Sequence, residues 1–130
     1  MDENNNSQIK VRDDITKELK KENNKKTGTV SFYGKDAKKE RLNEYTASGE
    51  KFDPNQDTIA LPDKPKSRKD YGKKYKVTNT ENGKSVIVRH NDLGPNKRLN
   101  RSGDLSYSAF KKIADEKKGL ITATIEPYEE

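Results

Sequence analysis

Three stretches of this chain have the hydrophobic pattern of short β-strands, two of them through alternation of apolar with polar or small positions. The stretches are TGTVSFYG (27–34), DTIALP (57–62) and LITATIEPY (120–128). Gly34 ends the first with a turn signal, and Pro62 stops the second because proline cannot donate to a sheet. The pattern therefore favours a mainly β fold.

A β-hairpin is predicted around Glu-Asn-Gly at 81–83, because Asn-Gly tolerates the positive φ angles of a tight turn. The flanking runs are rich in β-branched and aromatic residues. Tyr75 and Val77 would share one face of the first strand, and Val86 and Val88 one face of the second. The two runs should pair as neighbouring antiparallel strands.

One helix is predicted within LSYSAFKKIADEKKGL (105–120), beginning at Ser106 or Asp104 and reaching a cap at Gly119. Its inward stripe would be Ala109, Phe110, Ile113 and Ala114. Residues 1–27 are polar and form a predicted flexible tail or linker, within which Asp13 could cap a short helix. The folded domain is predicted over 28–127.

Composition limits the size of the core and the type of partner. Of 130 residues, 27% are hydrophobic and 38% charged, which fits one small domain. The net charge of +6 favours an anionic partner such as nucleic acid, anionic lipid or an acidic wall polymer. No run reaches the length of a membrane span, and MDENNNSQ lacks the basic start and apolar middle of a signal sequence. We expect an exported protein without its leader, or a phage protein.

Two aspartates are the first candidates for chemistry. Asp92 follows a predicted strand and precedes Gly-Pro, a position that suits a rigidly held general acid or base. Asp104 lies near the predicted helix start, where a capping role is the alternative. His90 would share the face of Val86 and Val88, so a partly buried ring competes with a role in a site.

Several classes of site are disfavoured. The chain has one histidine and no cysteine, and it lacks HExxH, EF-hand and GxSxG motifs, so we predict no metal, no cofactor and no serine hydrolase. The basic run KPKSRKDYGKKYK (64–76) holds seven Lys or Arg and two tyrosines. A solvated loop is favoured there over a nucleic-acid surface, because no nucleic-acid-binding motif accompanies the run.

The order of five stretches resembles a known family. GTVSFYG, TASGEKFD, TIALP, YKVTNTENGKSVIVRHNDLGP and GDLSYSAFKKIA follow one another between residues 28 and 126. Together they are similar to the rare lipoprotein A (RlpA)-like double-psi β-barrels, which are related to the first domain of expansins and to certain endoglucanases. The resemblance implies a mainly β, six-stranded double-psi β-barrel with one or two short helices behind a flexible N-terminal segment.

The resemblance also implies an activity on cell-wall glycans. RlpA-like lytic transglycosylases cleave peptidoglycan between N-acetylmuramic acid and N-acetylglucosamine. An acid protonates the glycosidic oxygen, and a base then helps the sugar's own 6-hydroxyl to close a 1,6-anhydro ring, so one carboxyl can serve both steps. A monomer in the cell envelope or outside the cell is implied, with no nucleic acid as partner; a phage virion is the alternative location.

Three carboxylates match the family's catalytic positions: Glu50 in TASGE, Asp92 in NDLGP and Asp104 in DLS. Ser31 takes the hydroxyl position of the first strand. The predicted substrate-binding set is completed by two aromatic residues that could stack on sugars and by three basic residues close to the aspartates in sequence: Phe32, Tyr33, Arg89, His90 and Arg101.

The chain departs from the family at Leu61, where RlpA-like transglycosylases usually carry a histidine, and at Gly103, where IDLS becomes GDLS. Expansin-like domains keep the two aspartates and bind glycans without hydrolysing them. The sequence therefore leaves a non-catalytic wall-binding module as the main alternative to a glycan lyase. Nucleic-acid binding and an inhibitor or phage-structural role of the same barrel are the remaining ones.

Overall fold

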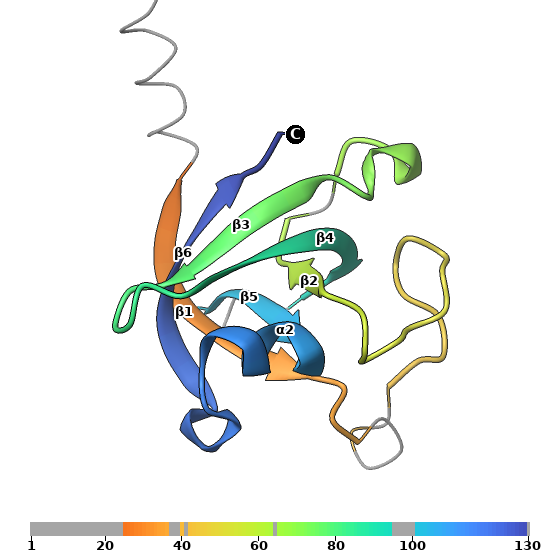
Figure 1. The fold of residues 1–130 in the computed structure, drawn as a ribbon. Coiled ribbons are helices and arrows are strands. Elements are labelled where there is room, and N and C mark those ends of the chain that lie inside the picture. Colours follow the sequence, from red (N-terminus) through yellow and green to blue (C-terminus); the bar gives the residue numbers. More distant parts are fainter. Residues whose placement is uncertain (1–24, 37–39, 41, 64, 95–100, 130) are drawn as a thin grey trace, which may run out of the picture.

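The described part of the chain folds into a closed six-stranded barrel with one α-helix, shown in Figure 1. This computed structural model describes residues 25–36, 40, 42–63, 65–94 and 101–129; the predicted tail helix near Asp13 lies outside them. The strands are β1 (Lys26–Tyr33), β2 (Thr58–Leu61), β3 (Lys74–Asn79), β4 (Ser85–Leu93), β5 (Arg101–Ser106) and β6 (Leu120–Pro127). The helix is α2 (Tyr107–Ile113), and two 3-10 turns are η1 (Arg68–Asp70) and η3 (Glu116–Lys118).

The barrel closes in the order β1-β5-β2-β4-β3-β6. Two strand pairs are parallel, β1 with β5 and β2 with β4, and the other four pairs are antiparallel. Because parallel neighbours need long crossover connections, each parallel pair joins segments far apart in the sequence. These two pairs carry the candidate site.

The predicted hairpin is confirmed. Val77 pairs with Val86 and Tyr75 with Val88, so both predicted faces meet. The connection spans residues 80–84, with Gly83 at φ 75°, so it is longer than the two-residue turn that Asn-Gly favours.

The core lies inside the barrel and beneath α2. Its buried apolar residues are Val30, Ile59, Val77, Val86, Val88, Leu105, Ala109, Phe110, Ile113, Ile121, Ala123 and Ile125. Ser106 caps α2 by accepting from the backbone N–H of Ala109, and Phe110 is fully buried. Figure 1 shows α2 lying against β1 and β5.

The helix ends earlier than predicted. It stops at Ile113, whose carbonyl accepts hydrogen bonds from the side-chain amides of Asn79 (2.8 Å) and Asn82 (3.0 Å). Asp115 then caps η3, and Gly119 ends this 3-10 turn instead of the α-helix. Tertiary contacts with the β3–β4 connection thus replace the last turns that the sequence predicts.

Strand β5 is absent from the predicted elements, because a charged segment with a glycine lacks the alternation of a strand. In the structure it fills the gap between β1 and β2. Gly103 permits this close approach: a Cβ there would lie 3.1 Å from Ile59 Cδ1 and 3.2 Å from the Ala60 carbonyl oxygen. Asp104 therefore belongs to a strand, and the helix begins after Ser106.

Candidate functional site

A β-bulge in β4 separates the directions of two neighbouring polar side chains. Ile59 pairs with His90 and the next residue, Ala60, pairs with Asp92, so Asn91 is the extra residue. An extra residue reverses the alternation of side chains along a strand. His90 therefore faces the barrel interior with Ile59, whereas Asp92 faces outward with Ala60.

A second bulge lies in β5, two residues before the other aspartate. Ser102 has no partner in the register of β1 with β5, which resumes with Val30 opposite Gly103 and Ser31 opposite Asp104. Val30 is fully buried in the core, so the next pair points to the outer surface. Both aspartates thus follow a bulge, and both lie on the outside of the barrel.

The two aspartates lie on either side of one small residue. Ala60 pairs with Asp92 of β4 and with Asp104 of β5, and Asp104 pairs in turn with Ser31 of β1. Neighbouring strands are about 4.8 Å apart, which places the two aspartate backbones roughly 10 Å apart. We call this row of four residues, Asp92, Ala60, Asp104 and Ser31, the carboxylate row.

Asp92 is held by three hydrogen bonds. The backbone N–H groups of Ala47 (3.0 Å) and Leu93 (2.9 Å) donate to Oδ1, and the Tyr33 hydroxyl donates to Oδ2 at 3.0 Å. Burial, followed by the negative charge of Asp92, raises the pKa of Tyr33 well above its usual range. Tyr33 therefore remains a protonated donor, and the carboxylate is fixed in orientation.

The TASGE turn (46–50) is fastened to the β4 bulge. Ser48 N–H donates to the Asn91 carbonyl at 3.0 Å. Glu50 accepts from Arg89 Nη1 (2.5 Å) and Asn91 Nδ2 (2.7 Å). Burial favours the neutral form of Glu50, but the hydrogen bonds from Arg89 and Asn91 outweigh it and lower the pKa of the carboxyl. Glu50 is thus an ionised anchor for the turn.

Asp104 has a different environment. Its carboxyl accepts a hydrogen bond from the buried Ser31 hydroxyl, and Arg101 Nη1 donates to Ser31 Oγ at 3.3 Å. Burial raises the pKa of Asp104, although the hydrogen bond from Ser31 and the charge of Arg101 oppose that shift. Burial at Asp104 therefore favours the protonated form of this carboxyl.

The family model described as "Lytic transglycolase" matches residues 25–125. The chain belongs to this lytic transglycolase family. Relatives include a probable endolytic peptidoglycan transglycosylase RlpA of Nostoc sp., 40% identical over 100 residues, and the endolytic peptidoglycan transglycosylase RlpA of Neisseria meningitidis, 38% identical over 100 residues. These matches cover 76% and 77% of this chain but only 24% and 38% of the relatives' own lengths.

Solved structures agree on the fold. The Streptomyces papain inhibitor aligns with a TM-score of 0.63 and 24% identity, over 81% of this chain and 94% of the inhibitor. A point mutant of Clavibacter michiganensis expansin in complex with cellohexaose aligns with a TM-score of 0.60 and 17% identity, over 81% of this chain and 50% of the expansin. With the family match, these similarities confirm the predicted double-psi β-barrel.

In this lytic transglycolase domain, seven of the nine predicted site residues form two hydrogen-bonded groups. Ser31, Arg101 and Asp104 form one, and Tyr33, Asp92, Glu50 and Arg89 belong to the other through the TASGE turn. The carboxylate row takes Asp104 and Ser31 from the first group and Asp92 from the second, and Ala60 lies between the two aspartates.

The structure places the other two predicted residues elsewhere. The Phe32 ring lies 4.7 Å from that of Phe110, so it belongs to the packing between β1 and α2. His90 is only 4% exposed and faces the barrel interior, where its Nε2 lies 3.0 Å from the Asp92 carbonyl oxygen. Its ring contacts the rings of Tyr71 and Tyr75, which come from the basic run.

Sequence reasoning did not identify the residues that support Tyr33. The Phe52 ring stacks against Tyr33 at 5.0 Å and lies over Gly34, where a Cβ would come within 2.3 Å of the Phe52 ring. Tyr45, in the segment that leads to the TASGE turn, is 60% exposed. In the sequence, these residues are marked by Gly34 directly after Phe-Tyr and by the aromatic residues Tyr45 and Phe52 on either side of TASGE.

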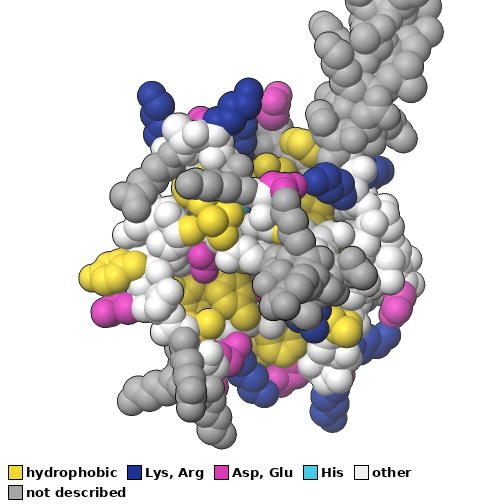
Figure 2. Space-filling model, turned by 180° about the vertical axis from the view of Figure 1, so that it is seen from behind, with side chains coloured by type: hydrophobic (Ala, Val, Ile, Leu, Met, Phe, Trp, Pro, Cys, Tyr) yellow, Lys and Arg dark blue, Asp and Glu magenta, His cyan; other side chains and the backbone are white. Residues whose placement is uncertain are grey.

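The charges around this domain are mixed. Figure 2 shows one face on which hydrophobic side chains occupy the centre, while positive and negative side chains both lie around the edge. Within the described part of the chain, no group of three or more His, Cys, Asp or Glu side chains could hold a metal ion.

Proposed function

We propose that this domain is a lytic transglycosylase that cleaves peptidoglycan glycan strands, with Asp104 as the acid and Asp92 as a fixed carboxylate. One observation carries the proposal: two outward carboxyls flank Ala60 in environments that differ, one fixed by three hydrogen bonds and one whose pKa burial raises. The names of the RlpA relatives supply the substrate class.

The chemistry follows from these environments. In its protonated form, which burial favours, Asp104 donates its proton to the glycosidic oxygen as the bond from C1 to that oxygen breaks. The carboxylate left behind is stabilised by the Ser31 hydroxyl and the positive charge of Arg101. The same carboxylate then takes the proton of the 6-hydroxyl as O6 bonds to C1, closing the 1,6-anhydro ring without an attacking water.

Asp92 supports that step electrostatically. Positive charge develops on the sugar ring in the transition state, and a carboxylate held in place beforehand stabilises it without further reorganisation. Glu50 acts through others: its bonds to Arg89 and Asn91 hold the TASGE turn, whose Ala47 N–H positions Asp92. We assign it a positioning role in place of a catalytic one.

The test uses glycan strands without peptides. We expect the wild-type chain to release products with anhydro-muramyl ends, identified by mass spectrometry. Asp104→Asn should reduce the rate by at least about 100-fold, because general acid catalysis typically contributes that much. Glu126→Gln, remote on β6, is the matched control and should keep the activity. Failure of the wild-type chain to form anhydro ends at any pH would end the enzymatic proposal.

A non-catalytic wall-binding module is the second candidate. It is favoured by Leu61 at the family's usual histidine position and by the exposed Tyr45 ring. In that case, the chain would sediment with insoluble peptidoglycan, and Asp92→Asn with Asp104→Asn would leave sedimentation unchanged while no product forms. Tyr45→Ala should weaken sedimentation in either case, because it removes sugar-stacking area.

We place the working site of this domain in the cell envelope or outside the cell, on peptidoglycan or another wall glycan; a phage virion that meets the same polymer is the alternative. We also propose a monomer that binds no nucleic acid, which sedimentation equilibrium and a gel-shift assay at low salt would test. Among the described residues, none forms a helix long and apolar enough to span a bilayer.

A further inference from the structure

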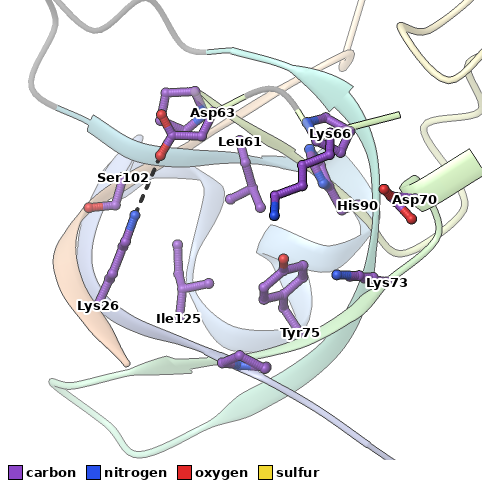
Figure 3. A pocket seen from close by; sticks show the side chains of 13 residues that line it. Lys26, Leu61, Asp63, Lys66, Asp70, Lys73, Tyr75, His90, Ser102 and Ile125 are labelled. Atoms are coloured by element: carbon purple, nitrogen blue, oxygen red, sulfur yellow. Dashed lines mark ion pairs between the residues drawn. The ribbon is translucent and has the colours of Figure 1, made fainter. Parts of the chain in front are cut away.

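The mouth of the barrel holds a pocket of about 490 Å³ on the inner side of the strands, which the proposed reaction does not use. Figure 3 looks into it. Apolar side chains from β2 and β6 line it, among them Leu61, Ile125 and Pro127. His90 and Tyr75 also line it, whereas Asp92 and Asp104 point outward. The pocket is therefore separate from the carboxylate row.

His90 lines this pocket, and its ring carries one hydrogen-bond acceptor. A carbonyl oxygen can only accept, so the contact at 3.0 Å makes Nε2 the donor to Asp92 and places the lone pair on Nδ1. Burial lowers the pKa of His90, which keeps the imidazole neutral. Nδ1 has no hydrogen bond within the described residues.

Tyr75 adds a hydroxyl to the same wall. It forms no hydrogen bond with the described part of the chain, and Figure 3 shows it pointing into the pocket beside Lys66 and Lys73. Burial raises the pKa of Tyr75, so the hydroxyl keeps its proton and can donate.

Positive charge at the rim exceeds what the nearby carboxylates neutralise. Lys26 pairs with Asp63 at 3.6 Å on one side of the pocket. On the other side, Asp70 accepts from the Ser67 hydroxyl at 3.2 Å. Lys66 and Lys73 are exposed and form no ion pair with any described residue. Two ammonium groups are thus available to an anion that enters beside Tyr75.

We propose that this pocket binds a small carboxylate with an amide N–H and an apolar side chain, the chemistry of an N-acylated amino acid or the C-terminal residue of a short peptide. The carboxylate would lie between Lys66 and Lys73 and accept from Tyr75. The amide N–H would donate to His90 Nδ1, and the side chain would contact Leu61 and Ile125. Ligand pockets usually combine a mostly apolar lining with a few polar groups at defined positions, and this pocket has both.

The test follows the His90 ring, the only imidazole in the chain, by NMR during titration of the full-length protein. N-acetyl-D-alanine and N-acetyl-L-alanine are the probes. Propionate lacks the amide and N-acetylalaninamide lacks the carboxylate. We expect a saturable shift of the His90 resonances with at least one acetylalanine, and at least tenfold weaker binding for both truncated compounds.

Variants locate the effect. Lys66→Ala with Lys73→Ala should weaken acetylalanine binding at least tenfold, and Tyr75→Phe several-fold. Lys76 lies on β3 next to Tyr75 but does not line the pocket, so Lys76→Ala should bind acetylalanine as the wild type does. Circular dichroism checks that each variant is folded.

The proposal would be overturned if neither N-acetyl-D-alanine nor N-acetyl-L-alanine produced a saturable shift. It would also be overturned if N-acetylalaninamide or inorganic phosphate bound as tightly as the better acetylalanine. Binding unchanged in the double lysine variant would overturn it too. Because the readout is binding at His90 and not glycan cleavage, failure here leaves the transglycosylase proposal standing, and failure of cleavage leaves this one.

Discussion

The hydrogen bond between Tyr33 and Asp92 offers the sharpest test of how the site is built. Tyr33→Phe removes only the hydroxyl that donates to Asp92 Oδ2 at 3.0 Å. The ring remains, together with its stacking against Phe52 at 5.0 Å. The variant therefore isolates one of the three hydrogen bonds that fix the carboxylate.

The expected loss follows from the type of bond and its exposure. A hydrogen bond to a charged group contributes about 1.5–3 kcal/mol to stability. Asp92 is only half-buried, so water replaces part of the lost interaction, and we expect about 1–2 kcal/mol. For a domain of this size, that loss corresponds to a fall in Tm of roughly 5–10 °C.

A double-mutant cycle with Asp92→Ala measures the pair itself. Thermal and urea unfolding of the wild type, both single variants and the double variant should give a coupling energy of about 1 kcal/mol or more. Tyr33→Phe combined with Asp115→Ala, at the distant η3 cap, is the control and should be additive. Coupling within about 0.3 kcal/mol of zero for Tyr33 and Asp92 would refute this account of the site.

Three further outcomes follow from packing and ionisation. Phe110→Ala should reduce the free energy of unfolding by about 3–5 kcal/mol in urea, because the ring is fully buried; a smaller loss than about 2 kcal/mol would contradict the described core. The pKa of His90 is lowered in the folded state, so the unfolded chain takes up a proton at a higher pH than the folded chain does. The free energy of unfolding should therefore fall as the pH drops below about 6.5. Unfolding measured across this pH range should lose that slope in His90→Gln. Gly34→Ala should lower the Tm more than Gly49→Ala does. Both glycines have positive φ, where a side chain costs about 1–2 kcal/mol, but only at Gly34 would the new methyl meet the Phe52 ring. Equal losses in the two variants would argue against that contact.

Local patterns were sufficient for most of the strands. Alternation and Asn-Gly predict β3 and β4 with the observed pairing of Val77 with Val86, because hairpin partners are close in sequence. The motifs around Glu50, Asp92 and Asp104 carry the family resemblance, and with it the barrel. These features depend on neighbouring residues, which a sequence displays directly.

Tertiary structure decided what those residues face. Strand β5 forms only because β1 and β2 lie on either side of it, and no local periodicity marks a strand held by partners so distant in sequence. The extra Asn91 in β4 turns Asp92 outward and leaves His90 inside, although regular alternation would place both on one face. Whether a residue is the extra one in a bulge depends on the register with another strand, and that register exists only after the barrel closes.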